Sequence, residues 1–577
     1  MLSRPHISLG ASLAALSLVL PRLVSADSVV TDNSTSWYAT TAPVQTFHSS
    51  NVTPPEWNVL TLDAERVSEG SVLLSYRGTA TSQAAPLIMD NNGSLVWSGA
   101  EAGYGDSMDL IVQKYKGEDV LTFYQGADFY SGGYGYGYWN ILSNNYSLIR
   151  TVSSLNQTED ESDFHEFIIT ENDTALVESW RITQADLTGA GGDGIGWTWD
   201  CVFQEIDISG ASRESDALLF EWRALDHMDT GESYFQVENN GNSSDNAFDF
   251  CHINSVEKIA ATGDYLISMR GPSTIYLIDG QSGAITWRLS GKSSNFTMGE
   301  NATFWYQHDA RLMEGQDISS GVFNISLFDN AAGGGEPAEA TARAIVLQLD
   351  TNAWTATLVR EDIPSFYAPA ASQGSNQPLD DGSFFVGWGA QPYFTEYAPD
   401  GTIVQGVTFG TTESVVMSYR AFKQTWHGYP LTNPSIAVSG SSAFVSWNGA
   451  TDVASWTLLG GTNESGVTNE VSTLAKSGFE TEIANIGETY SYLAAAAVAS
   501  DGTCLGVSAV YSTASLSSTS TNGTCPSGST VASAGTNGTS TASGSDTSAD
   551  DESGAGRIAA SVAGAGAAAV AALFAAL

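Results

Sequence analysis

The feature that most constrains the fold of this chain is a β-hairpin that recurs between residues 57 and 430. Each copy has a short apolar run, a turn built from Asp or Asn and Gly, and a second run that often ends in Trp. Copies with Trp span 87–97, 203–222 and 275–287, and a copy without Trp spans 394–404. Runs rich in β-branched and aromatic residues with Asp-Gly turns favour antiparallel hairpins.

Recurrence of one hairpin type predicts a β-propeller, because a single blade cannot bury both of its faces and blades therefore stack around a central channel. We predict an all-β protein with a six-bladed propeller in residues 27–430. That length exceeds six blades of ~40–50 residues, so we expect long loops over its faces. One or two β-sandwiches are the alternative, which the repetition disfavours.

Residues 431–511 have a different pattern. Short alternating strands follow one another about every ten residues, with an early Trp447 and a late Tyr490. This spacing predicts a fibronectin-type III-like β-sandwich without chemistry of its own. Residues 512–553 are dominated by Ser, Thr, Gly and Ala, so we expect a disordered, O-glycosylatable stalk.

The two ends of the chain are predicted to be targeting segments. Arg4, an apolar stretch over 7–20 and the small residues at 24–26 are typical of a signal peptide in residues 1–26, since the apolar run is too short for a good membrane anchor. Small residues at 553–555 precede an uncharged apolar tail at 558–577. We therefore expect residues 554–577 to be a GPI-attachment signal, with a transmembrane tail as the alternative. Both place the protein outside the cell, tethered at the cell surface to the plasma membrane or the cell wall.

Glycosylation sequons and cysteines agree with secretion. Thirteen N-x-S/T sequons occur, at Asn33, Asn51, Asn92, Asn145, Asn156, Asn172, Asn242, Asn295, Asn301, Asn324, Asn463, Asn522 and Asn537. Four cysteines allow three disulfide connectivities, of which the simplest joins Cys201 to Cys251 and Cys504 to Cys525. No C-x-x-C is present, so we predict no zinc or redox motif and no metal.

The charge balance excludes one class of partner. The chain has 21 Lys and Arg against 64 Asp and Glu, a net charge of −43. So acidic a surface repels phosphate backbones, and we predict no nucleic-acid binding. With 64 acidic residues, the sequence does not exclude a pair of carboxylates that acts as acid and base in a glycosidase.

Histidines are rare and stand in distinctive places. Six follow the expected signal peptide: His48, His165, His227, His252, His308 and His427. Four of these lie in polar-aromatic segments at expected strand starts, at 163–167, 250–255, 306–311 and 424–428. Residues that precede the innermost strand of a blade line the channel, so these histidines can converge on it. The alternative is that each is hydrogen-bonded within its own blade.

An ordered set of motifs then points to a known family. His252-Ile-Asn254 opens an expected strand, Arg270 follows 16 residues after Asn254, and Gln307-His-Asp-Ala-Arg311 comes after the hairpin at 275–287. Over residues 57–430 the chain resembles the arylsulfotransferase (arylsulfate sulfotransferase, ASST) family, in particular its secreted fungal branch. The resemblance implies a six-bladed propeller that moves a sulfuryl group from a phenolic sulfate ester to a phenol without the nucleotide sulfate donor. We therefore expect no cofactor.

The same resemblance implies residue roles. His308 is the nucleophile that becomes transiently sulfated, His252, Asn254 and Arg270 surround the sulfuryl oxygens, His165 completes the pocket, and Arg311 binds substrate. The chemistry suits these residue types, because a neutral imidazole is nucleophilic and a guanidinium fork stabilises charge on equatorial oxygens.

Two other functions remain open from the sequence. The tail, stalk and sandwich also fit a non-catalytic cell-surface propeller, acting as an adhesin or glycan-binding scaffold. A quinone-cofactor dehydrogenase is a weaker alternative, since such enzymes also have Trp-rich blades. The Tyr- and Gly-rich segment 130–139 could stack on an aryl group, but a flexible loop is the simpler interpretation.

Overall fold

The computed structural model describes residues 43–129, 133–157, 161–332, 341–364, 370–410, 415–526 and 530. The expected signal peptide, the C-terminal tail, most of the expected stalk and the sequons at Asn33 and Asn537 lie outside these ranges. In the described ranges no helix is both long enough and apolar enough to cross a bilayer.

The described chain is all-β, as predicted. Its only helices are short 3-10 turns: η1 (Gly99–Ala102), η2 (Thr188–Ala190), η3 (Arg213–Ser215), η4 (Ala224–Asp226), η5 (Thr230–Glu232), η6 (Ser244–Asn246), η7 (Ile318–Ser320) and η8 (Glu464–Gly466).

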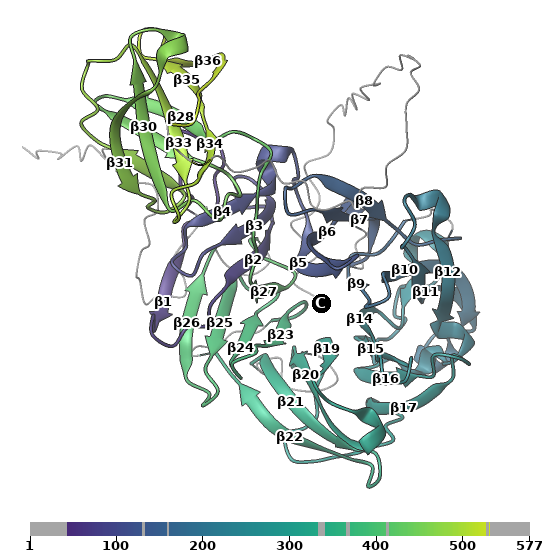
Figure 1. Ribbon diagram of the computed structural model, residues 1–577. Coiled ribbons are helices and arrows are strands. Elements are labelled where there is room, and N and C mark those ends of the chain that lie inside the picture. Colours follow the sequence, from purple (N-terminus) through teal and green to yellow (C-terminus); the bar gives the residue numbers. More distant parts are fainter. Residues whose placement is uncertain are drawn as a thin grey trace, which may run out of the picture.

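Six sheets of four or five strands make up the first part of the described chain, and Figure 1 shows them arranged in a ring. Sheet one contains β27 (Ala421–Gln424), β2 (Ser71–Tyr76), β3 (Ala85–Met89) and β4 (Leu95–Ser98). Sheet two contains β5 (Met108–Tyr115), β6 (Glu118–Phe129), β7 (Gly135–Leu142) and β8 (Leu148–Val152). Sheet three contains β9 (Phe167–Ile169), β10 (Thr174–Asp186), β11 (Ile195–Asp207) and β12 (Ala217–Arg223), with β13 (Phe248–Asp249) beside β11.

The other three sheets repeat this order from the centre of the ring outward. Sheet four contains β14 (Ile253–Lys258), β15 (Tyr265–Met269), β16 (Thr274–Ile278) and β17 (Ile285–Ser290). Sheet five contains β19 (His308–Leu312), β20 (Val322–Asp329), β21 (Arg343–Asp350), β22 (Thr355–Asp362) and β18 (Thr297–Met298). Sheet six contains β23 (Ser375–Pro378), β24 (Phe384–Gly387), β25 (Tyr393–Tyr397), β26 (Ile403–Thr408) and β1 (Asn58–Leu62).

The hairpins predicted from the sequence are confirmed. They are β3–β4, β11–β12, β16–β17 and β25–β26, which lie in four different sheets. Their turns depend on local residues, which is why a local pattern identified them.

The ring is closed at two places by strands far apart in the sequence. β27 pairs antiparallel with β2 in sheet one, and β1 pairs antiparallel with β26 in sheet six. The C-terminal strand β27 thus completes sheet one, and the N-terminal strand β1 completes sheet six. β27, like β5, β9, β14, β19 and β23, lies at the inner edge of its sheet (Figure 1).

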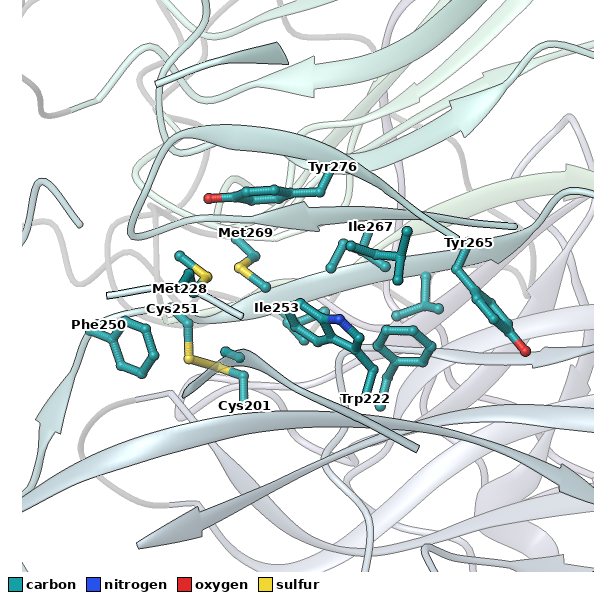
Figure 2. Close-up of a cluster of buried hydrophobic side chains, with 14 of the residues drawn as sticks. Cys201, Trp222, Met228, Phe250, Cys251, Ile253, Tyr265, Ile267, Met269 and Tyr276 are labelled. Carbon is teal, nitrogen blue, oxygen red and sulfur yellow. A yellow bond between two sulfur atoms is a disulfide. The ribbon is translucent and has the colours of Figure 1, made fainter. Parts of the chain in front are cut away.

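Apolar side chains fill the spaces between neighbouring sheets. In one such core, Phe203 and Trp222 of sheet three pack with Ile267 and Tyr276 of sheet four. The disulfide between Cys201 and Cys251 lies at the edge of this core (Figure 2). Burial of both sheet faces is the main stabilising contribution in such a stack.

Two further sheets follow the ring. One contains β28 (Ser435–Ser439), β29 (Ser442–Ser446) and β32 (Glu480–Ile483). The other contains β31 (Asn469–Ala475), β30 (Ser455–Gly461), β33 (Tyr492–Val498), β35 (Ala509–Ser512), β36 (Ser517–Asn522) and β34 (Cys504–Val507). Both sheets contribute to one core, with Val445 from the first and Trp456 and Leu493 from the second.

The sheet structure continues beyond the predicted boundary at residue 511. β36 lies in the range expected to be stalk and pairs with β35. A Ser/Thr-rich strand needs no core here because it lies at an edge with nearly all its residues exposed. The disulfides join Cys201 to Cys251 and Cys504 to Cys525. This is the simplest of the three connectivities that four cysteines allow, as predicted.

Candidate active site

Three histidines from three different sheets meet near the centre of the ring. His165 lies two residues before the start of β9, His252 directly precedes β14, and His308 is the first residue of β19. The rings of His165 and His252 lie edge to face with centroids 4.7 Å apart. The ring of Tyr419 has its centroid 5.6 Å from that of His165 and 6.3 Å from that of His308. All of these side chains are buried.

Irregular backbone at the start of the inner strands positions these side chains. The register shifts between Ile253 and Ser255 in β14 and between His308 and Arg311 in β19. His252 has φ 57° and Asp309 has φ 53°, in the left-handed region that non-glycine residues rarely adopt. Bulges of this kind re-aim side chains, and they are common next to functional sites.

Two of the histidines are backed by carboxylates. His252 Nδ1 lies 2.7 Å from Asp249 Oδ2, and Asp249 Oδ1 accepts a hydrogen bond of 2.6 Å from the Tyr134 hydroxyl. His165 Nδ1 is hydrogen-bonded to Asp163 Oδ1. In the described part of the chain, Nε2 of either ring has no hydrogen-bond partner. Burial raises the pKa of Asp249, but His252, the hydrogen bond from Tyr134 and the charge of Arg270 together lower this pKa overall.

His308 has a different environment. Its Nδ1 lies 2.7 Å from the amide oxygen of Asn330, so this nitrogen carries the proton, and its Nε2 accepts a hydrogen bond of 3.1 Å from the Gln373 N–H. Burial, and then the positive charge of Arg270, lower the pKa of His308 well below its usual value. His308 is therefore a neutral imidazole whose lone pair is on Nε2.

Arg270 makes no ion pair among the described residues, although the charge of Asp249 acts on it. It follows β15, and its backbone N–H donates to the carbonyl oxygen of His252 over 2.9 Å. Its guanidinium lies over the rings of Tyr306 and Phe235, 4.9 and 5.3 Å from their centroids. Among the described residues it makes no ion pair and its side chain makes no hydrogen bond, and its buried Nε has no partner. Five unused donors beside three imidazoles suit a small oxyanion.

Asn254 and Arg311 are placed differently from Arg270. Asn254 Nδ2 donates to the Gln307 carbonyl oxygen over 2.7 Å. Arg311 pairs with Glu166 at 2.6 Å and with Asp309 at 2.9 Å. Both side chains thus make contacts within the protein, although the buried Oδ1 of Asn254 has no hydrogen-bond partner among the described residues.

Arg420, which the sequence analysis did not identify, ties the inner strands together. Its guanidinium pairs with Asp109 at 2.8 Å and Glu166 at 3.1 Å, and donates to the carbonyl oxygens of His165 and Asn254. It therefore fixes the backbone beside two of the predicted site residues. A lone Arg gives no sequence signal for such a role, because all its partners come from other sheets.

A cavity of about 120 Å³ is lined by this ion network and by residues further along the inner strands. Asp109, Arg311, Arg420 and Phe422 contribute to its wall, and the three histidines do not. Burial raises the pKa of Asp109 to about 7. The cavity is thus distinct from the histidine cluster.

One group of described residues has donor atoms close enough together to hold a metal ion. Asp163, His165 and Glu178 are all buried, and their ligand atoms lie within 4.8 Å of one another. Asp163 and His165 are already hydrogen-bonded to each other. Burial, and then the charge of Asp163, raise the pKa of Glu178 well above its usual value. A neutral Glu178 needs no cation beside it.

The Tyr- and Gly-rich segment is not a flexible loop where it is described. Residues 135–139 belong to β7, and Tyr134 stacks on Trp199 with ring centroids 4.5 Å apart. Tyr134 also lies 4.8 Å from the His252 ring. The other histidines lie elsewhere: His48 stacks on Phe444, and His227 stacks on Trp222.

The sequence matches the arylsulfotransferase (ASST) family over residues 111–410, more than half of the 577-residue chain. The chain belongs to this family. The matched stretch includes His165, His252, Arg270 and His308, so the family resemblance seen in the motifs is confirmed. Tyr419 and Arg420 lie just beyond the end of the match.

Other comparisons gave only distant similarity. No curated protein matches the chain. A protein of unknown function from Bacteroides caccae is 12% identical, with a TM-score of 0.33 over 62% of this chain and 99% of that chain. Apo AztD from Citrobacter koseri is 6% identical, with a TM-score of 0.30 over 62% and 99% of the two chains. The GH43 protein BlXynB from Bacillus licheniformis is 11% identical, with a TM-score of 0.28 over 68% and 84%.

Proposed function

We propose that this arylsulfotransferase-family protein is an enzyme that transfers a sulfuryl group from a phenolic sulfate ester to a phenol through a sulfo-histidine. One observation carries the proposal: an unpaired, half-buried guanidinium, that of Arg270, lies with three converged imidazoles in a protein of net charge −43. In so acidic a molecule this cluster is a local site for an anion. Convergence also counts against a non-catalytic scaffold, for which scattered histidines are expected.

His308 is the proposed nucleophile, because it is the histidine held neutral beside Arg270. Its Nε2 leaves the Gln373 N–H and attacks the sulfur, the N–S bond forms, and the bond from sulfur to the phenolic oxygen breaks to release a phenolate. The oxygen of the acceptor phenol then attacks the sulfur, and the N–S bond breaks to restore the imidazole. Arg270 stabilises the charge on the equatorial oxygens in both steps.

His252 is the proposed acid and base. The Asp249 carboxylate holds its Nδ1–H, which orients the ring and stabilises the imidazolium. Its Nε2 is then available to protonate the leaving phenolate and to deprotonate the acceptor phenol. His165, with Asp163, completes the pocket, and the hydrogen bond from Asn254 to Gln307 supports the strand that carries His308. The ion pairs of Arg311 support a structural role in place of the substrate contact expected from the resemblance.

The architecture and location expected from the sequence belong to the same proposal. We take the six sheets as the six blades of a propeller and the two later sheets as a fibronectin-type III-like sandwich. We further propose that the protein belongs to the secreted fungal branch, loses a signal peptide, is N-glycosylated, and is anchored at the cell surface through GPI. The two disulfides support an oxidising compartment.

The direct test measures release of 4-nitrophenol from 4-nitrophenyl sulfate in the presence of a phenol acceptor. The wild type is expected to show acceptor-dependent release, the His308→Ala variant none above background, and the His427→Ala variant wild-type rates, because His427 is largely exposed and outside the cluster. Mass spectrometry of the enzyme quenched without acceptor should find a sulfuryl group on His308. A wild type no faster than His308→Ala would refute the proposal.

A further inference from the structure

We infer that the hydroxyl of Tyr419 is a further hydrogen-bond donor to the sulfuryl group in this site. The inference rests on the proposed function for the identity of the ligand. It adds a residue that the sequence motifs did not indicate.

The hydroxyl of Tyr419 is buried and unused. The residue is 1% exposed, and its hydroxyl has no hydrogen-bond partner among the described residues. A buried hydroxyl without a partner is destabilising, because it has lost its hydrogen bonds to water. Such a group in a functional cluster requires an explanation, and a ligand that accepts the hydrogen bond supplies one.

The ring of Tyr419 is held on several sides by the residues of the candidate site. It lies edge to face against His165 at an interplanar angle of 79° and against His308 at 72°. The guanidinium of Arg420 lies 5.3 Å from the centroid of the Tyr419 ring. The backbone oxygen of Tyr419 accepts a hydrogen bond of 3.0 Å from the Gly374 N–H. The ring of Tyr419 thus contacts both the proposed nucleophile and His165.

The electrostatics of the site favour donation over proton transfer. Burial raises the pKa of Tyr419 well above its usual value, so the hydroxyl keeps its proton throughout the working range. Tyr419 also lies near enough to Arg270 to be among the groups that act on the Arg270 charge. A fixed donor next to a cation stabilises charge on a transferring oxygen without any bond to hydrogen being broken.

The test compares Tyr419→Phe with a matched control, Tyr397→Phe. Tyr397 is also 1% exposed with an unpartnered buried hydroxyl, but it lies in β25 of sheet six, away from the histidines. Both variants lose only a hydroxyl, and neither is expected to melt at a lower temperature than the wild type. The readouts are the affinity for inorganic sulfate, measured by calorimetry, and kcat and KM with 4-nitrophenyl sulfate.

We expect Tyr419→Phe to lower kcat by about 10²-fold and to weaken sulfate binding, while Tyr397→Phe changes neither quantity. Wild-type kcat and sulfate affinity in Tyr419→Phe would overturn the inference and leave the proposed transfer intact. If the wild type binds sulfate in a Tyr419-dependent way but transfers nothing, the donor role stands and the proposed activity falls. If the wild type neither binds sulfate nor transfers it, both fall.

Discussion

At the scale of single residues, the chemistry depends on which polar groups the protein leaves without a partner. Arg311 and Arg420 are matched by carboxylates, whereas Arg270 is matched by none among the described residues. His308 is hydrogen-bonded at both ring nitrogens, whereas His252 is bonded at Nδ1 alone. The charge of Arg270 and the Nε2 of His252 can act on a substrate directly, whereas the lone pair of His308 becomes available when its Nε2 leaves the Gln373 N–H.

Replacing Arg270 should reduce transfer sharply. Arg270→Ala is expected to lower kcat/KM by about 10²–10³-fold, because one oxyanion donor group is lost. Arg270→Lys should recover only part of the rate, since an ammonium has no planar fork. Arg66→Ala is the control, because Arg66 is exposed and pairs with Asp400 on the surface. Steady-state kinetics check this, and equal rates for Arg270→Ala and Arg66→Ala would contradict it.

The lowered pKa of the buried histidines has a consequence for pH dependence. Burial lowers the pKa of both His165 and His308, so they remain neutral below the usual histidine value of about 6.5. The acidic limb of the kcat profile should therefore lie below that value.

The same lowered pKa affects stability. Below about pH 6.5 the unfolded chain binds protons that the folded chain does not, so the melting temperature should fall as the pH drops below that value. The fall should be smaller in His308→Gln, and an equal fall would be inconsistent with a buried neutral His308.

At the scale of elements, the inner strands both carry and restrain the site. The disulfide of Cys201 and Cys251 joins β11 to the segment just before His252, and the His252 N–H donates to Cys201 Sγ over 3.0 Å. The disulfide of Cys504 and Cys525 lies in the last two-sheet unit, away from the histidines. The first disulfide can thus affect the position of His252, whereas the second can affect only the stability of the last two-sheet unit.

Removing the two disulfides should separate stability from activity. Replacing Cys201 and Cys251 by Ser is expected to lower the free energy of unfolding by about 2–4 kcal/mol and also to lower kcat, because the backbone of His252 loses a support. Replacing Cys504 and Cys525 by Ser should lower stability but leave kcat unchanged. Denaturant unfolding and kinetics on both double variants check this; equal effects on kcat would show that the first disulfide does not position His252.

At the scale of the whole molecule, the acidic surface repels the anionic substrate that the proposed site binds. The net charge of −43 repels an aryl sulfate anion at long range, whereas a buried cluster acts at short range. The ring closure by β1 and β27 places that cluster where all six sheets contribute their inner edges. The surface therefore acts on the substrate through its net charge, whereas the site acts through the nearby guanidinium of Arg270.

Ionic strength should affect the two substrates differently. Added sodium chloride screens the surface charge over a Debye length of about 8–10 Å at physiological salt, so KM for the anionic donor should fall as salt is raised from low values. KM for a neutral phenol acceptor is the internal control and should not change. Initial rates at several salt concentrations measure this, and parallel changes for both substrates would exclude long-range repulsion as the cause.

The sequence by itself determined the local units of this protein. The turn residues and β-branched runs specified the hairpins β3–β4 and β16–β17, because a hairpin forms from neighbours in the chain. The ordered set of motifs at 252–254, 270, 275–287 and 307–311 identified the family, which the match over residues 111–410 confirmed. The 13-residue strand β10 and the edge strand β36 were not anticipated, because their lengths depend on pairing partners.

Only the tertiary structure decided how the site residues are used. The partners of His308 are Asn330 and Gln373, and those of Arg420 come from several sheets, so no local pattern indicated them. In the structure Arg311 forms ion pairs with two carboxylates, whereas Arg270 forms none with the described residues. The physical reason is that these hydrogen bonds and ion pairs join residues from 22 to 311 positions apart, and those of Arg420 form only once β27 has met β2.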